Sequence, residues 1–142
     1  MNTYNRAEAI IDLDRITENV KHLKALAGVD LMAVVKADAY GHGLIPVSRA
    51  ALAGGATSLG VALLEEAITL REAGITAPIL LLSEQPAELA DLIVGYQLTP
   101  TVTTTRGAAV LAASASAADQ TVKIHIKVDT GMHRVGVAPN EV

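Results

Sequence analysis

Residues 58–82, SLGVALLEEAITLREAGITAPILLL, are predicted to form a strand, a helix and a second strand in immediate succession. The apolar run at 58–62 is typical of a buried strand, and 78–82 is a second run of the same kind. Residues 63–73 are predicted to form the intervening helix, which ends at Gly74. Such a strand–helix–strand unit favours a parallel sheet covered by helices.

The same alternation continues on both sides of this unit. Further strands are predicted at 8–13, 30–36, 98–102 and 121–129. Further helices are predicted at 14–27, 43–53, 86–94 and 105–117. Asp14 is expected to cap the first of these helices, and the alanine-rich stretch at 108–118 is expected to pack on the outside of the sheet. The pattern therefore predicts an α/β fold.

Two α/β architectures are compatible with this pattern. About five β-α units fit an open doubly wound sheet, whereas a (β/α)8 barrel needs eight units and about 250 residues. As a barrel, a chain of 142 residues would be incomplete. No G-x-G-x-x-G or Walker loop follows a predicted strand, which disfavours the nucleotide-binding form of the open sheet. Composition does not distinguish the two architectures.

The composition excludes several classes of function. Hydrophobic residues make up 51% of the chain, which is enough to bury a core even without Phe or Trp. The formal charge of −4 and the lack of a basic run disfavour nucleic acids and membrane surfaces as partners. The absence of cysteine excludes thiolate chemistry, and the spacing of other residues predicts no metal site. Since the start is not signal-like and no apolar run reaches membrane-spanning length, a cytoplasmic protein is expected.

The strongest local motif is AVVKADAYGHG, at residues 33–43. Lys36 closes an apolar strand and is followed at once by Asp38, Tyr40 and His42 among small residues. Active sites of α/β proteins form at the carboxyl ends of strands, where a lysine amine can attack a carbonyl group. The alternative is that Lys36 only extends into solvent from the strand end.

A second motif is KIHIKVDTGMHRVG, at residues 123–136. The period of a strand places four polar side chains on one face: Lys123, His125, Lys127 and Asp129. Polar side chains gathered in this way need partners or a cavity, although an edge strand with one solvated face would also satisfy them. Arg134 follows in a predicted loop, where it could reach a ligand anion or remain in solvent.

Other polar residues are predicted to have structural or surface roles and not catalytic ones. Glu65 and Glu66 open the helix at 63–73, where carboxylates interact favourably with the helix dipole, so a structural role is expected for both. His22 lies on the helix at 14–27 and is expected at the surface.

At the two motifs the sequence resembles the alanine racemases, a family of pyridoxal-phosphate (PLP) enzymes. AVVKADAYGHG is similar to the family's cofactor-attachment motif almost letter for letter, and HIKVDTGMHRVG is similar to its second signature. Residues 58–82 share the family's strand–helix–strand pattern, so the likeness covers essentially the whole chain. The resemblance implies a (β/α)8 TIM barrel of the alanine-racemase type, incomplete in these 142 residues.

The resemblance implies roles for four residues. Lys36 would form the internal aldimine with PLP and act as the acid/base on one face of the substrate. Tyr40 would help to hold the cofactor phosphate. Arg134 would hydrogen-bond the cofactor's phenolic oxygen and contact the substrate. Lys127 matches the lysine that many members carry as a carbamate, an anion that could orient Arg134.

The resemblance also implies an activity, the interconversion of L-alanine and D-alanine for peptidoglycan precursors, carried out by a homodimer. Family members have a complete barrel followed by a β-rich domain, and this domain of the partner subunit supplies the tyrosine that acts on the opposite face. Residues 1–142 therefore resemble the amino-terminal portion of the PLP-binding barrel domain without the carboxy-terminal β domain. Alone, they are expected to be inactive.

Three other functions stay open at this point. A racemase of the same fold could act on serine or on several amino acids. A truncated, non-catalytic chain could bind PLP or serve as an association module. An unrelated open-sheet protein that binds a small molecule would require both motif matches to be accidental.

Overall fold

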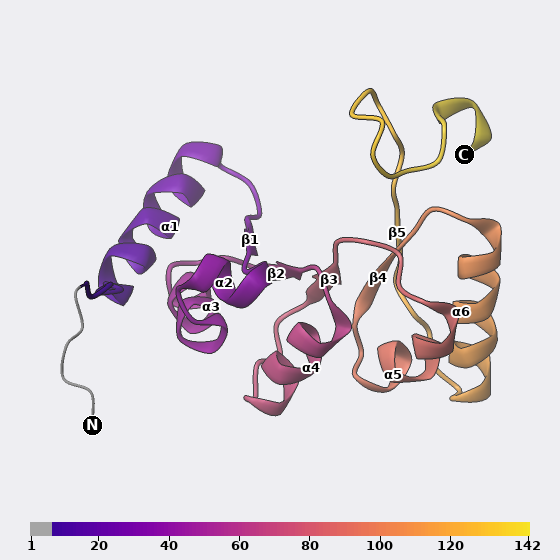
Figure 1. The fold of residues 1–142 in the computed structure, drawn as a ribbon, viewed down its shortest axis with the longest axis horizontal. Coiled ribbons are helices and arrows are strands. Elements are labelled where there is room, and N and C mark those ends of the chain that lie inside the picture. The colour runs from indigo at the N-terminus through magenta and orange to yellow at the C-terminus, as the bar shows by residue number, and fades with distance from the viewer. Residues whose placement is uncertain (1–6) are drawn as a thin grey trace.

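Five parallel strands form one sheet in the computed structural model, which describes residues 7–142 (Figure 1). The strands are β1 (Met32–Val34), β2 (Ser58–Val61), β3 (Ile79–Leu81), β4 (Thr99–Val102) and β5 (His125–Ile126). The α-helices are α1 (Leu13–Ala27), α2 (Lys36–Gly41), α3 (Leu44–Ala53), α4 (Leu64–Glu72), α5 (Ala90–Gly95) and α6 (Thr105–Ala117). Two short 3-10 helices, η1 (Ala87–Leu89) and η2 (Pro139–Glu141), complete the secondary structure of the described residues.

The order of the strands decides between the two predicted architectures. The strands follow one another as β1-β2-β3-β4-β5, and each is parallel to the next. A doubly wound sheet reverses its strand order at a switch point, whereas a (β/α)8 barrel keeps the order of the sequence. The structure therefore confirms the predicted barrel-type fold, of which the chain forms an arc of five strands.

One face of the sheet carries the hydrophobic core. Its strand residues Leu59, Val61, Ile79 and Leu81 are fully buried. They cluster with buried residues of the covering helices, among them Leu64, Ala67, Leu70, Ile93 and Leu111. Aliphatic side chains thus fill the space between strands and helices, as the lack of Phe and Trp predicted.

The opposite face of the sheet is more open. Gly60 lies on this face, where an added Cβ would be 3.2 Å from Met32 Sδ and 3.5 Å from Leu82 Cδ2. Val34, on the same face, is 40% exposed. In a (β/α)8 barrel the face turned away from the helices lines the interior of the barrel.

The predicted beginning of the fold is wrong in two respects. Residues 8–13 are not a strand, because nothing in the described chain pairs with them, and Ile10 is 84% exposed. Asp12, not Asp14, caps α1: its backbone is extended and its side chain accepts a hydrogen bond from the Arg15 N–H at 3.1 Å. Asp14 lies in the first turn instead, where its charge faces the amino end of the helix dipole.

Two predicted elements differ from expectation, one because it is shorter and the other because it is divided. Of the strand predicted at 121–129, only His125–Ile126 form a ladder with β4. Beyond them the chain turns back on itself, so that Asp129 N–H donates to the carbonyl of Val137 at 2.9 Å. The helix predicted at 86–94 is divided into η1 and α5.

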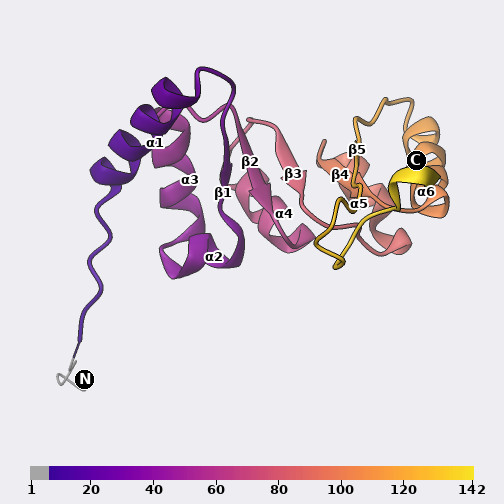
Figure 2. The ribbon, with the colours of Figure 1, turned by 90° about the horizontal axis from the view of Figure 1, so that it is seen from above.

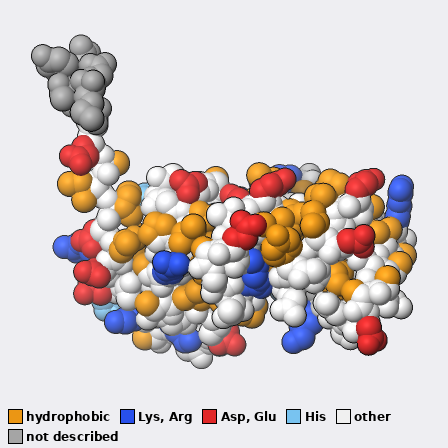
Figure 3. All heavy atoms as spheres, turned by 90° about the horizontal axis from the view of Figure 1, so that it is seen from below, with side chains coloured by type: hydrophobic (Ala, Val, Ile, Leu, Met, Phe, Trp, Pro, Cys, Tyr) orange, Lys and Arg blue, Asp and Glu red, His pale blue; other side chains and the backbone are white. Residues whose placement is uncertain are grey.

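Charged side chains of both signs are spread over the face of the molecule shown in Figure 3, and hydrophobic side chains show between them. Within residues 7–142, no helix combines the length and the hydrophobicity that a membrane span requires.

Candidate active site

Lys36 lies at the carboxyl edge of the sheet as the first residue of α2, because β1 ends at Val34, two residues earlier than the strand predicted at 30–36. The preceding residue, Val35, is 2% exposed, and its N–H donates to the carbonyl of Gly60 at 2.9 Å. Lys36 itself is half-buried. Hydrogen bonding to β2 thus continues up to Val35 and fixes the backbone position from which the Lys36 side chain extends.

The chain after Lys36 adopts an unusual conformation. Ala37, Asp38, Ala39 and Tyr40 all have left-handed backbone angles, with φ between 52° and 58°. For residues with a Cβ this conformation costs roughly 1–2 kcal/mol each. The left-handed turn must therefore be held by contacts from elsewhere in the fold.

Hydrogen bonds hold this turn at both ends. At its start, Ala37 N–H donates to Glu66 Oε1 on α4 at 2.5 Å. At its end, Asp38 Oδ1 accepts from the Leu44 N–H at 2.6 Å. Ala39 is buried in the core, and the Tyr40 side chain is 59% exposed. Lys36 and Tyr40 are consequently presented together at the carboxyl edge by a turn of fixed shape.

The second motif contains β5, at the other end of the strand order. Lys127 is half-buried, and its Nζ donates to the carbonyl of Leu82 at 3.1 Å, at the end of β3. The register pairs His125 with Thr101, so His125 and Lys127 lie on the face of the sheet that carries Thr101. The face predicted for these two residues thus agrees with the observed pairing.

A small turn shapes the segment between Lys127 and Arg134. Asp129 Oδ1 accepts from the Gly131 and His133 N–H groups, both at 3.0 Å, and Oδ2 lies 3.3 Å from His133 Nδ1. These bonds, first from Gly131 and then from His133, hold the pKa of Asp129 below its ordinary value. Arg134 follows the turn and is exposed.

The fold therefore brings the four predicted site residues to the carboxyl edge of one sheet, in two groups. Lys36 and Tyr40 lie beside β1, whereas Lys127 and Arg134 follow β5. In the barrel arc these are the first and last strands, with β2, β3 and β4 between them.

Two glutamates at this edge have contacts that the sequence did not predict. Besides Ala37, the carboxylate of Glu66 also accepts from the backbone of Ala62 and Leu63. Glu84, after β3, accepts from the hydroxyls of Thr103 and Thr104 at 2.5 and 2.6 Å, and from the Thr103 N–H. The only sign of the Glu84 contacts in the sequence is that a carboxylate follows a buried strand, because its partners Thr103 and Thr104 lie 19 and 20 residues away.

The hydrogen bonds also decide the ionisation of Glu84. Burial alone would raise the pKa of Glu84, but the bonds from Thr103 and Thr104 together hold it below its ordinary value. The charged form is thus the one that ties the loop after β3 to the loop after β4.

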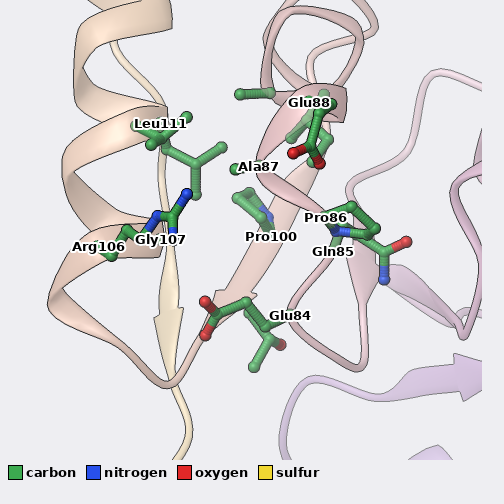
Figure 4. Close-up of a pocket in the computed structure, with 13 residues that line it drawn as sticks. Glu84, Gln85, Pro86, Ala87, Glu88, Pro100, Arg106, Gly107 and Leu111 are labelled. Carbon is green, nitrogen blue, oxygen red and sulfur yellow. The ribbon is translucent and has the colours of Figure 1, made fainter.

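A cavity of about 320 Å³ lies beside Glu84, between η1, α5 and α6 (Figure 4). It is lined partly by core residues such as Ile93 and Leu111, so it belongs to the helix side of the sheet. Lys36 and Lys127 do not line it, and it is not part of the candidate active site. Within residues 7–142, no group of three or more His, Asp or Glu residues is placed to hold a metal ion.

Known proteins of similar sequence are alanine racemases. The family described as "Alanine racemase, N-terminal domain" matches residues 11–142. Alanine racemase from Desulfovibrio desulfuricans is 46% identical over 135 residues, which are 94% of this chain and 36% of the relative. That from Desulfosudis oleivorans is 48% identical over 139 residues, 96% of this chain and 35% of the relative.

Solved structures agree with this match. The crystal structure of alanine racemase from E. faecalis superposes with a TM-score of 0.86 at 43% identity, covering 92% of this chain and 36% of that one. The enzyme from Streptomyces lavendulae gives a TM-score of 0.84 at 40% identity, with 92% and 34% covered. The chain spans about a third of the length of the relatives it matches. By sequence and by fold, the chain belongs to the alanine racemase family, and its residues 11–142 match the family described by that N-terminal domain.

Proposed function

We propose that this chain carries the lysine half of a PLP-dependent racemase site, which in a complete enzyme interconverts L-alanine and D-alanine. The observation that supports the proposal most directly is the placement of Lys36. It extends from the carboxyl edge of a barrel-type sheet, and a turn held by Glu66 and Asp38 fixes the backbone beside it. The family match adds the reaction and the substrate.

The residues present are chemically suited to PLP. The Lys36 amine is the group that would hold the aldehyde carbon. The exposed side chains of Tyr40 and Arg134 are accessible to an anionic ligand, the first suited to the phosphate and the second to the phenolic oxygen. When bound, PLP supplies an electron sink that stabilises the negative charge left on a carbon that loses its proton.

In this proposal Lys36 has a second task, the transfer of a proton at the α-carbon of the substrate. Because the turn fixes the backbone beside it, its amine would act at one face of the α-carbon. Inversion needs a second acid/base on the opposite face. We propose that this group, and the partner subunit of a homodimer, lie in the part of the family's proteins that these 142 residues do not cover. Residues 1–142 would then be the amino-terminal portion of the PLP-binding barrel and inactive alone.

We further propose that Lys127 is carbamylated in the complete enzyme. A carbamate keeps one N–H on Nζ, so the bond to the Leu82 carbonyl at 3.1 Å can persist after modification. The added carboxylate would then face the segment that carries Arg134 and attract its guanidinium. Mass spectrometry of the native protein in bicarbonate should show the mass of one added carbon dioxide, lost in the Lys127→Ala variant. An unmodified mass would contradict this.

The biological setting is proposed by the same resemblance. The D-alanine produced would supply peptidoglycan precursors, and the enzyme would work in the cytoplasm. A complete enzyme that acted equally well on serine would favour the alternative of a racemase with broad specificity.

The first test is the reaction of the chain with PLP. Visible absorption should report an adduct, and borohydride reduction followed by peptide mapping should place it at Lys36. Lys36→Ala should abolish this adduct, whereas Lys127→Ala, at the other lysine of the same edge, should retain it. Labelling spread evenly over many lysines in a folded sample would contradict the proposal.

A further inference from the structure

We propose that Glu66 is a positioning residue for Lys36, because its carboxylate fixes the peptide group that joins Lys36 to Ala37. The inference rests on the proposed function, which gives Lys36 its chemical role. It assigns Glu66 more than the favourable charge–dipole interaction that its place on α4 predicts.

The contacts of Glu66 join two neighbouring strand ends. Oε1 accepts from the Ala37 N–H at 2.5 Å, beyond β1. Oε2 accepts from the Ala62 N–H at 3.0 Å and the Leu63 N–H at 3.1 Å, beyond β2. One half-buried side chain thus holds three backbone amides at the carboxyl edge.

These contacts control Lys36 through its backbone. The N–H of Ala37 belongs to the peptide plane attached to the α-carbon of Lys36, so its direction sets the ψ angle of Lys36. A fixed ψ fixes where the lysine side chain starts relative to the sheet. Ala37 is the first left-handed residue of the turn. Without the Glu66 carboxylate, no hydrogen bond to its N–H would offset the energetic cost of its positive φ.

The chemistry of the three donors requires a carboxylate. Both oxygens of Glu66 accept, and all three of its partners are N–H groups. Glutamine replaces one acceptor oxygen by an NH2 group and leaves the other oxygen neutral, so the bond from Ala37 is either lost or weakened. Aspartate keeps the charge at the α4 end but is one methylene shorter, so it should serve Ala62 and Leu63 while losing Ala37.

The neighbouring glutamate provides a matched control. Glu65 lies in the same first turn of α4 and carries the same charge, but it is exposed. A Glu65→Gln substitution therefore changes the charge near the helix end as Glu66→Gln does. It does not touch the peptide beside Lys36.

The deciding experiment measures hydrogen exchange at the Ala37 amide in the 142-residue chain without PLP. Glu66→Gln and Glu66→Asp should accelerate exchange about 10-fold or more, the factor expected for losing a hydrogen bond to a charged group, whereas Glu65→Gln should not. Glu66→Asp decides the question if Glu66→Gln does not fold. Exchange at Ala37 that matches the Glu65→Gln variant in both Glu66 variants would overturn the inference.

A second readout separates positioning from stability. Well below the unfolding temperature of each variant, the rate of PLP attachment at Lys36 should fall in Glu66→Asp by a factor similar to the gain in exchange, with its pH dependence unchanged in shape. Attachment at the wild-type rate despite accelerated exchange would overturn the positioning role. If the wild-type chain forms no adduct at Lys36, the proposed function fails, and the exchange measurement alone still decides whether Glu66 fixes the peptide.

Discussion

At the scale of single residues, carboxylates accept many of the hydrogen bonds that hold the loops at the carboxyl edge of this sheet. Glu66 and Glu84 each accept a backbone N–H from a neighbouring loop, whereas Asp38 and Asp129 accept backbone N–H groups a few residues further along their own segments. Hydrogen bonds with an ionised acceptor are stronger than neutral ones. The loops at this edge are therefore shaped mainly by these acidic residues.

The turn at Asp129 makes this dependence on ionisation measurable. Its pKa is lower in the folded chain than its ordinary value of 3.8, because the Gly131 and His133 N–H groups bond to the charged form. The stabilisation is thus fully present above the ordinary pKa and is lost as the pH falls through the folded one. In an acid titration followed by NMR, the amide shifts of Gly131 and His133 should move together with a midpoint below 3.8.

The control for this titration is Asp129→Asn, which cannot ionise and should remove the shared transition. A midpoint at or above the ordinary aspartate value would show that these bonds do not form in solution.

At the scale of elements, the left-handed turn after Lys36 predicts an unusual effect of glycine. Ala37→Gly should increase the free energy of unfolding by about 0.5–1 kcal/mol, since glycine adopts positive φ without steric cost and loses only part of this gain to chain entropy. Ala109→Gly, at an exposed position in right-handed α6, should decrease it by about 1 kcal/mol.

Urea denaturation of the two variants checks this opposition of sign. The same substitution is made in α2, which contains the left-handed turn, and in right-handed α6. If Ala37→Gly lost as much stability as Ala109→Gly, residue 37 would not be left-handed in solution.

The same elements show how far the sequence can predict this fold. Four predicted strands, at 30–36, 58–62, 78–82 and 98–102, contain the observed strands β1 to β4. They were predictable because each is an apolar segment bounded by polar or glycine residues. The left-handed turn was not predictable, since Ala and Tyr have no local preference for it, Asp adopts it only as a single residue, and Glu66 lies 29 residues away. The strand predicted at 8–13 is wrong because nothing in the described chain pairs with these residues, and the sequence of a short segment does not show whether a partner exists.

The candidate site was predictable to a similar degree. The position of Lys36 at a strand end follows from the apolar run before it, and the shared face of His125 and Lys127 follows from the period of two. The roles of Glu66 and Glu84 depend on contacts between different loops, which spacing along the chain does not encode.

At the scale of the whole molecule, the 142 residues should associate when isolated. Within the described residues, β1 and β5 each pair with one neighbour only, so both leave backbone donors and acceptors at a sheet edge. Apolar side chains add to this tendency, since Ile126 is 56% exposed and Leu26 is 86% exposed. Sedimentation velocity should show a sedimentation coefficient that rises with concentration. A single monomeric species across the whole range would contradict this.

The sequential order of the strands also affects when the fold can form. Figure 2 shows the chain advancing steadily from α1 and β1 at one end to β5 and α6 at the other. Each strand pairs with the one synthesised just before it, so no strand has to wait for a distant part of the chain before it can pair. On a translating ribosome, the Lys36 strand can thus be secured by β2 and Glu66 while the polypeptide is still being made. The order of translation is then also the order in which the site is built.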